Sequence, residues 1–314
     1  MKNFHKKILI VPTKKAYLPD IYIYKKLFRK FNLAVEIIEK PDKTILKDFN
    51  VIWRFMGIDA NSMERNDQLL IHEYQSSSVK PLPRFKNKIK KFINAKPDIR
   101  IFQNKIVMAS FKFNDNIKTF FRPMGVSKDF LLDKPGNKYH YDFLYVGTLN
   151  KRPKTLKDLM NIGKLLPNKK ILLIGDIDEK IKTKLLKYSA NFYFKGFVEY
   201  SELPHLYRKC EYGLNLIPNE YPYNQQDSTK LIEYSAAGMK IISSDNHIAR
   251  TFQKNFSVPI VFFNEFNIHT INKINSLDKK KYDLVKENIS ELTWDKIIYN
   301  LLIRDGLLEI INNS

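Results

Sequence analysis

The chain has 314 residues and a mass of 37.2 kDa, which exceeds one small core and suits two domains of about 100–200 residues each. Its hydrophobic content of 44%, with 13% aromatic residues, excludes wholesale disorder. A single cysteine, Cys210, excludes an intrachain disulfide and a cysteine-based metal cluster, and it fits a reducing compartment. Because no apolar run approaches the roughly 20 residues of a membrane span, we expect a cytoplasmic protein that is soluble or peripheral to the inner membrane.

The positive charge is distributed unevenly along the chain. Residues 1–140 hold 29 Lys+Arg and 13 Asp+Glu, so they carry +16 of the total net charge of +21. Such a field attracts anionic lipid, nucleic acid or a phosphorylated glycan. A lysine-rich proteome would explain the total equally well, but it explains the asymmetry less well.

In the first half, short apolar runs alternate with helical stretches. A helix is predicted from about residue 20 to residue 31, after the first buried strand. Because the strands are separated by about 10–25 residues, the connections predict parallel crossovers and a doubly wound sheet. The predicted strands are residues 7–11, 34–38, 51–55, 69–74, 99–103 and 118–122.

The polar stretch 129–141, with its Pro-Gly pair, is the predicted linker, and the βα pattern restarts after it. We therefore predict two Rossmann-like domains, 1–135 and 136–300, facing a cleft at the carboxyl ends of their strands. Residues 301–314 are expected to form a C-terminal helix that crosses back to the first domain. The second set of strands is predicted at 143–147, 171–175, 191–196, 212–218, 240–245 and 258–263, with helices at 154–165, 202–209 and 228–237.

The segment 227–238, DSTKLIEYSAAG, has the features of a phosphate-binding helix. Asp227 or Ser228 can cap its amino end, and Gly238 can end it. Free backbone N–H groups together with Lys230 would bind a diphosphate, and Glu233, one turn further on, could accept hydrogen bonds from ribose hydroxyls. An ordinary amphipathic helix with a Lys–Glu pair is the competing interpretation.

A basic loop strengthens the first interpretation. The run FLYVGTLNKRPKTLKDL places Gly147 at a strand end and then Arg152 and Lys154 before a helix. Glycine lets a phosphate approach the backbone closely, and the cations balance its charge.

The order of these segments resembles the C-terminal half of family 4-like retaining glycosyltransferases of the GT-B fold. The resemblance rests on FLYVG with its basic loop, LLIGD, FKGFVEYSELPHLYRKCEYGLNLIPN, the 227–238 helix and GMKIISSD. It covers residues 142–300 well and extends weakly to 60–130 through IHEYQ and FRPMGVSKDF.

The resemblance implies a role for several positions. Glu233 matches the second glutamate of the E-x7-E motif and should bind the ribose, and the backbone of Phe197 and Val198 should border the base. A UDP-sugar is the favoured donor. The residues expected around its diphosphate are Gly147, Arg152, Lys154, Ser228, Thr229 and Lys230.

The sequence departs from the family pattern at two places. Gln225 stands eight residues before Glu233, where many relatives carry the glutamate that contacts the transferred sugar. An amide can still hydrogen-bond sugar hydroxyls. The amino-terminal glycine loop of many relatives is also missing, because the first glycine in this chain is Gly57.

On the acceptor side, His72 and Glu73 follow an apolar run and are expected at the mouth of the cleft. The family often has a histidine near the transferring sugar, so His72, Glu73 and Gln225 are the candidate catalytic residues. A histidine that is merely hydrogen-bonded at a strand end is the competing interpretation.

Residues 84–93, RFKNKIKKFI, place Phe85, Ile89, Phe92 and Ile93 on one helical face among five cations. This is the pattern of a helix at a membrane interface. A basic surface helix packed on its sheet is the competing interpretation.

These features predict a glycosyltransferase that transfers a sugar from a nucleotide-sugar to a glycan or lipid-linked glycan of a bacterial cell-surface polysaccharide. No D-x-D-like motif is present, so we expect no cofactor and metal-independent turnover, with cations stabilising the departing diphosphate. Peripheral contact with an anionic membrane through the basic first domain is expected, and nucleic acid is not the favoured partner. The alternatives are a nucleotide-sugar 2-epimerase, a nucleic-acid-modifying glucosyltransferase and a non-catalytic nucleotide-sugar-binding subunit.

Overall fold

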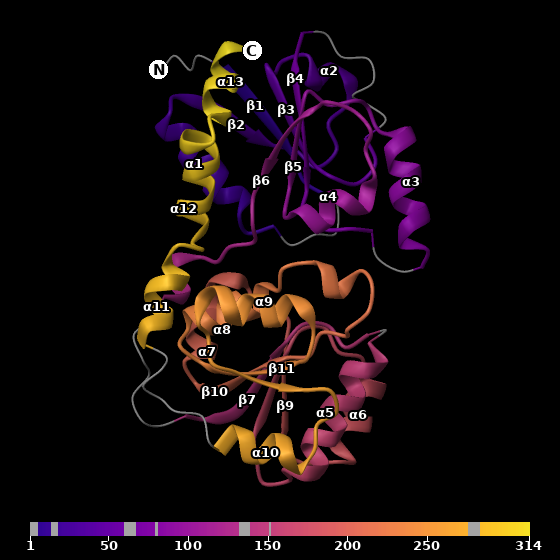
Figure 1. Cartoon of the computed structure of the whole chain (residues 1–314), viewed down its shortest axis with the longest axis vertical. Coiled ribbons are helices and arrows are strands. Elements are labelled where there is room, and N and C mark those ends of the chain that lie inside the picture. The colour runs from indigo at the N-terminus through magenta and orange to yellow at the C-terminus, as the bar shows by residue number, and fades with distance from the viewer. Residues whose placement is uncertain are drawn as a thin grey trace. The chain divides into compact units, whose positions relative to one another are not determined.

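The computed structural model describes residues 6–13, 18–59, 67–78, 81–131, 139–150, 152–275 and 283–314. The chain divides into two compact units (Figure 1). The first comprises residues 1–127, 225–227 and 292–314, and the second comprises residues 128–224 and 228–291.

Within the described part of the first unit, six parallel strands form one sheet in the order β2-β1-β3-β4-β5-β6. The strands are β1 (Lys6–Val11), β2 (Leu33–Ile37), β3 (Val51–Phe55), β4 (Leu69–Tyr74), β5 (Ile99–Phe102) and β6 (Lys118–Phe121). The helices of this unit are α1 (Ile21–Lys30), α2 (Lys43–Leu46), α3 (Pro83–Ile93), α4 (Lys105–Phe111), α12 (Trp294–Tyr299), the π-helical turn Asn300–Arg304 and α13 (Leu307–Asn313).

The described part of the second unit also has one six-stranded parallel sheet, in the order β12-β11-β10-β7-β8-β9. Its strands are β7 (Tyr141–Val146), β8 (Ile171–Ile174), β9 (Phe192–Gly196), β10 (Cys210–Asn215), β11 (Lys240–Ser244) and β12 (Ile260–Phe263). Its helices are α5 (Pro153–Leu165), α6 (Glu179–Leu186), α7 (Leu203–Tyr207), α8 (Thr229–Ala236), α9 (His247–Phe256), α10 (Ile268–Asn275) and α11 (Asp283–Ser290), with short 3-10 turns at Lys128–Phe130, Tyr200–Glu202 and Tyr223–Gln225.

These apolar runs form central strands because helices cover both faces of a parallel sheet. All residues of β3, β4 and β5 are buried, including the polar ones. On one side of the first sheet, the aromatic rings of Tyr24 and Trp53 pack 4.8 Å apart between centroids. The core of the second unit gathers side chains from β7, β8 and β10 together with α5.

The doubly wound α/β class predicted from the sequence is confirmed, and every predicted strand is present within a few residues of its expected position. The observed units change over at Ser127 and Lys128. The predicted boundary at residue 135 and most of the predicted linker, residues 132–138, lie outside the described residues.

The carboxyl-terminal segment belongs to the first unit from Leu292, nine residues before the expected crossing at 301. Trp294, Leu301 and Ile311 lie in the same buried cluster as residues of α1 and β3. Gly125 explains part of this docking, because a Cβ there would lie 2.7 Å from the Trp294 ring. Figure 1 shows α12 beside α1.

Across the ranges that the structure describes, no helix combines the length and the apolar character that crossing a bilayer requires.

Candidate functional site

The sheet of the second unit reverses its winding direction between β7 and β10. The chain adds β8 and β9 on one side of β7 and then adds β11 and β12 beyond β10 on the other. At such a reversal the loops that leave the two central strands separate, and a crevice opens outside the carboxyl ends of the strands. The loop after β7 contains Gly147 to Arg152, and α8 follows β10, so the predicted diphosphate residues flank this point.

Gly147 and the side chain of Lys230 lie next to each other. A Cβ on Gly147 would be 3.4 Å from Cε and 3.5 Å from Nζ of Lys230. The φ of Gly147 is +137°, a conformation that side chains rarely adopt. The glycine thus places backbone without a side chain next to an ammonium group, which is a suitable arrangement for approaching a phosphate.

Two cationic side chains, Lys230 and Arg152, lie near Gly147, and the charge of one lowers the pKa of the other. Arg152 precedes α5, and its guanidinium carbon lies 5.7 Å from the centre of the Tyr223 ring. Burial, and then the neighbouring charge of Arg152, lower the pKa of Lys230 to about 8, while Glu233 opposes the shift. An anion bound here would relieve the repulsion between the two cations.

The amino end of α8 is fixed by hydrogen bonds to the sheet. The Ser228 hydroxyl accepts a hydrogen bond from the N–H of Leu231 at 3.4 Å, so Ser228 is the N-cap. The same hydroxyl donates to Oδ1 of Asn215 at 2.8 Å, and the Asn215 amide donates to the Ser243 hydroxyl at 2.8 Å. Neighbouring strands β10 and β11 therefore orient the helix end that was predicted to bind phosphate.

The helix ends as the sequence predicts. The N–H of Gly238 donates to the carbonyl of Ser235 at 3.1 Å, and the N–H of Met239 donates to that of Tyr234 at 2.9 Å. These two bonds form a Schellman motif with Gly238 in the left-handed conformation.

Glu233 is a buried carboxyl group next to a pair of tyrosines. It is 7% exposed, and its Oε2 accepts a hydrogen bond from the Tyr207 hydroxyl at 2.8 Å. Burial raises the pKa of Glu233 to about 7, although hydrogen bonds from Tyr207 and Tyr200 and the charge of Lys230 oppose the shift. The group is therefore close to half-ionised at neutral pH, in an environment where an added hydroxyl donor would favour the charged form.

The remaining donor-side residues differ in position. Lys154 is about half exposed, and its Nζ lies 3.5 Å from Oδ2 of Asp158 on the same helix. Thr229 is partly buried at the first turn of α8. In the loop after β9, the Phe197 side chain is 71% exposed and Val198 is partly buried.

His72 and Glu73 are not at an open strand end as expected. Both side chains lie within β4, with exposures of 0% and 1%, and point to opposite faces of the sheet. The His72 Nε2 is 3.0 Å from Oδ2 of Asp59, and burial lowers the pKa of His72 despite that carboxylate. Both side chains are therefore buried beside polar partners, Asp59 and Arg122, and are not exposed at a strand end. Their catalytic role stays a prediction.

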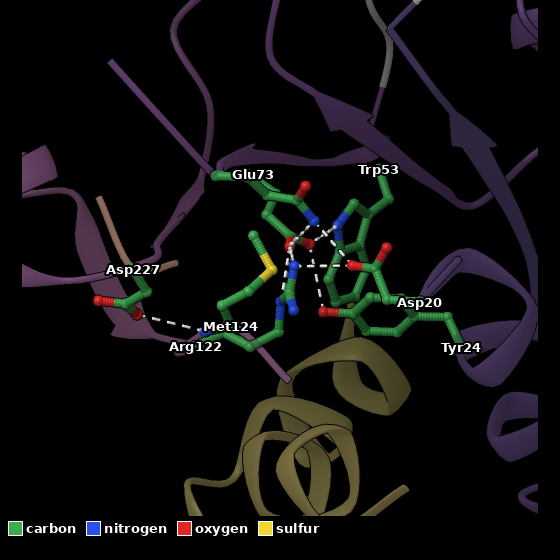
Figure 2. Close-up of polar contacts among 8 residues, drawn as sticks. Asp20, Tyr24, Trp53, Glu73, Arg122, Met124 and Asp227 are labelled. Atoms are coloured by element: carbon green, nitrogen blue, oxygen red, sulfur yellow. Dashed lines mark hydrogen bonds and ion pairs between the residues drawn. The ribbon is translucent and has the colours of Figure 1, made fainter. Parts of the chain in front are cut away.

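Glu73 belongs to a buried ion cluster that Figure 2 shows in close-up. Its Oε1 accepts a hydrogen bond from Nε of Arg122 at 2.6 Å, and its Oε2 accepts one from the Trp53 indole at 2.9 Å. The same guanidinium donates to Oδ2 of Asp20 at 2.8 Å. This cluster ties α1, β3, β4 and the end of β6 together, so Glu73 has a structural explanation.

Gln225 and Asp227 lie just before α8 and belong to the first unit. The backbone carbonyl of Gln225 accepts a hydrogen bond from the Asn104 amide at 3.5 Å. Asp227, the alternative cap, does not cap the helix. Its carboxylate accepts a hydrogen bond from the Asn104 amide at 3.2 Å. It also accepts one from the N–H of Met124 at 3.4 Å (Figure 2). Burial raises the pKa of Asp227.

The sequence interpretation missed the supporting residues of this site. Tyr200 and Tyr207 stand beside Glu233, Asn215 holds Ser228, and the hydroxyl of Tyr145 would lie 3.4 Å from a Cβ on Gly147. All four fall inside segments on which the family resemblance rests: Tyr145 lies in FLYVG, and the other three lie in FKGFVEYSELPHLYRKCEYGLNLIPN. That position was the available signal.

No cluster of three or more His, Cys, Asp or Glu side chains with metal-binding geometry occurs in the portion of the chain that the structure describes.

Two doubly wound parallel sheets of this kind define the GT-B fold of glycosyltransferases, and solved structures of that class match the chain nearly end to end. A glycosyltransferase from Rickettsia africae ESF-5 is 14% identical with a TM-score of 0.69, over 99% of this chain and 100% of that chain. Sucrose-phosphate synthase from Thermosynechococcus elongatus is 13% identical with a TM-score of 0.73, over 98% and 100%. HepE of Anabaena in complex with UDP-glucose is 13% identical with a TM-score of 0.68, over 97% and 100%.

No family model and no curated protein matches the sequence. At these identities the structural likeness shows the fold, and the residues of the site carry the functional argument.

Proposed function

We propose that the chain is a glycosyltransferase that takes a sugar from a nucleoside-diphosphate sugar held by its second unit. The observation that carries the proposal is the convergence of Gly147, Arg152 and Lys230 at the strand-order reversal, with the carboxyl of Glu233 one turn further along α8. These groups are complementary to a diphosphate followed by a ribose.

The charge distribution supports a nucleotide-sugar over a neutral ligand. The Lys230 ammonium and the Arg152 guanidinium repel each other, and a diphosphate between them would replace repulsion with attraction. In the reaction, the same cations and the N–H groups of the first turn of α8 would stabilise the negative charge that grows on the leaving diphosphate as the glycosidic bond breaks. This supply of positive charge is why we propose turnover without a metal ion.

UDP is the nucleotide we propose, because the solved HepE structures of the same fold contain UDP and UDP-glucose. The finer assignment is a hexosyl transfer with retention to a glycan or lipid-linked glycan of a bacterial cell-surface polysaccharide, on the cytoplasmic side of the membrane. It rests on the similarity to family 4-like enzymes. Gln225 would contact the transferred sugar, with its side-chain amide as hydrogen-bond donor and acceptor.

The roles predicted for His72 and Glu73 can be separated from a structural role by experiment. If His72 or Glu73 acts in catalysis, its substitution should lower kcat and leave the Tm of the protein unchanged. If the residue only stabilises the first unit, its substitution should lower Tm, and activity should fall in proportion. The buried partners Asp59 and Arg122 favour the second outcome.

The test of the donor site is direct binding. Calorimetry with UDP-, GDP-, ADP-, dTDP- and CMP-sugars should reveal one preferred donor, and Lys230→Met and Glu233→Ala should each weaken it by about tenfold or more with unchanged circular dichroism. Lys164→Met, at the exposed last turn of α5, is the matched control. Unchanged affinity in both site variants would refute the assignment, and a free C2 epimer as product would identify the epimerase instead.

A further inference from the structure

The helix α3 exposes its apolar residues. Phe85 is 58% exposed, Phe92 is 70% exposed and Ile93 is 40% exposed, and Leu82, which precedes the helix, is 69% exposed. A helix that packs on its own sheet buries such residues. The sequence interpretation of residues 84–93 as a surface helix with a packed apolar face is therefore wrong at these positions.

A polar residue attaches α3 to the rest of the first unit instead. Asn87 is 1% exposed; its Oδ1 accepts a hydrogen bond from the N–H of Ser78 at 3.1 Å, and its amide donates to the carbonyl of Ser110 at 3.3 Å. Ser110 lies in α4, the neighbouring helix (Figure 1). The Asn87 side chain of α3 thus points inward.

Helical geometry sets the apolar face opposite this anchor. At about 100° per residue, Phe92 lies roughly 140° around the helix from Asn87, and Phe85 lies roughly 160° from it in the same sense. Phe85 and Phe92, seven residues apart, share nearly the same direction. Both rings therefore project away from the body of the unit.

Cations border the exposed rings. The helix contains five Lys or Arg residues and no acidic residue: Arg84, Lys86, Lys88, Lys90 and Lys91. By the same geometry, Lys86 and Lys88 lie on the two flanks of the apolar face. On the protein side, Lys91 donates to the carbonyl of Lys112 at 2.6 Å.

A neighbouring loop extends the apolar patch. Ile58 is 67% exposed, and its loop is held against the end of α3: the Asp59 N–H donates to Oδ1 of Asn94 at 2.8 Å, and the Asn94 amide donates to the carbonyl of Gly57 at 3.3 Å. We define the α3 patch as the exposed apolar residues Ile58, Leu82, Phe85, Phe92 and Ile93, and these hydrogen bonds hold the Ile58 loop beside the carboxyl end of α3.

We propose that the α3 patch binds an anionic lipid bilayer, with the helix lying in the plane of the membrane. The rings would enter the boundary between headgroups and acyl chains while Lys86 and Lys88 reach lipid phosphates. The five cations of α3, a helix that contains no acidic residue, are complementary to a negative surface and select an anionic membrane over a neutral one. The inference goes beyond the proposed activity, because it requires neither the donor site nor an identified acceptor.

The test is vesicle binding by the full chain. Co-sedimentation with vesicles of phosphatidylcholine and phosphatidylglycerol should exceed that with phosphatidylcholine alone. The double variant Phe85→Ser with Phe92→Ser should reduce binding about tenfold or more, because two aromatic anchors are lost. The control Tyr22→Ser, which removes a ring that is 72% exposed on α1, should not.

Charge and insertion are tested separately. Lys86→Gln with Lys88→Gln should weaken binding to anionic vesicles by about tenfold, whereas Arg29→Gln with Lys30→Gln on α1 should change it by less. In Phe92→Trp the tryptophan emission should shift to the blue on adding anionic vesicles, and in Tyr22→Trp it should not.

The proposal would be overturned if the double substitutions on α3 and on α1 weakened binding to anionic vesicles equally. It would also be overturned if the tryptophan emission of Phe92→Trp did not shift when vesicles bind. Retention of a single-stranded RNA oligonucleotide by the α3 patch, together with no vesicle binding, would overturn it in favour of nucleic acid. Calorimetry of the same variants with UDP-glucose distinguishes this failure from failure of the proposed activity, because the α3 variants should bind the donor normally.

Discussion

The affinity of the site for a nucleotide-sugar should depend on pH in a way that follows from two side chains. The diphosphate needs Lys230 protonated, and its pKa is about 8. The ribose hydroxyls need Glu233 ionised, and its pKa is about 7. Affinity should therefore rise as pH increases through about 7 and fall as pH increases through about 8.

The size of the effect follows from the two pKa values. At pH 7.5 about three quarters of each group is in the required state, so about 60% of the protein is competent; at pH 6 or pH 9 the competent share is about 9%. The association constant for UDP-glucose should thus be about sixfold lower at either extreme than at pH 7.5. Titration calorimetry in buffers of constant ionic strength measures it.

Substitutions at Lys230 and Glu233 show which side chain causes the fall in affinity at high pH and which causes the fall at low pH. Lys230→Met should lower the maximum and abolish the fall above pH 8, whereas Glu233→Gln should abolish the fall below pH 7. A constant affinity from pH 6 to pH 9, or a high-pH fall that survives Lys230→Met, would refute the reasoning.

Donor binding favours the ionised form of Glu233, whereas the stability of the folded protein should favour its protonated form. Its pKa is raised in the folded protein from 4.5 to about 7, so its contribution to stability is complete below about pH 4.5 and is lost as pH rises through 7. Glu233→Gln should therefore raise the stability of the ligand-free protein at pH 8, by on the order of 2–3 kcal/mol, while it weakens donor binding. A lower Tm for this variant at pH 8 would contradict the conclusion that the buried, ionised carboxylate destabilises the folded protein.

Further substitutions test the packing around the two sheets. Gly213→Ala should destabilise the second unit by about 1–3 kcal/mol or more in urea unfolding, since the new Cβ would lie 2.4 Å from Cγ of Tyr234; a neutral effect would mean that the ring can move away. Gly147→Ala should lower Tm through its φ of +137° and also weaken UDP-glucose binding, and loss of Tm with unchanged affinity would place the glycine outside the site. Arg122→Met should lower the free energy of unfolding by about 3–5 kcal/mol, because Glu73 is left buried without its cation. If this is the cause, the double change Arg122→Met with Glu73→Gln should restore stability. An additive loss in the double variant would contradict it.

The order of elements was predictable because it depends on local patterns. Each central strand of a parallel sheet is covered on both faces, so runs such as VIWRF and ILLIG are apolar almost throughout, and each is separated from the next by enough residues for a crossover. The cap at Ser228 and the end of α8 at Gly238 also depend on neighbours within a few residues.

The location of His72 and Glu73 could not be predicted in the same way. An apolar run followed by two polar residues is the same pattern whether the polar pair faces solvent or meets partners inside the fold. Their partners Asp59 and Arg122 stand 13 and 49 residues away in sequence, and only the arrangement of the sheet brings them together. The face that α3 presents was likewise undetermined, since its packing depends on one hydrogen-bonded asparagine.

The sequence by itself determined two doubly wound units, the helix at 228–237 and the residue types around it, because hydrophobic period, caps and glycine positions act over a few residues. The tertiary structure decided which polar groups share a site and which stay buried as ion pairs. The pKa values of Lys230 and Glu233 belong to this second category, since they depend on burial and on charges from other elements. Long-range packing sets those surroundings, and no local pattern encodes them.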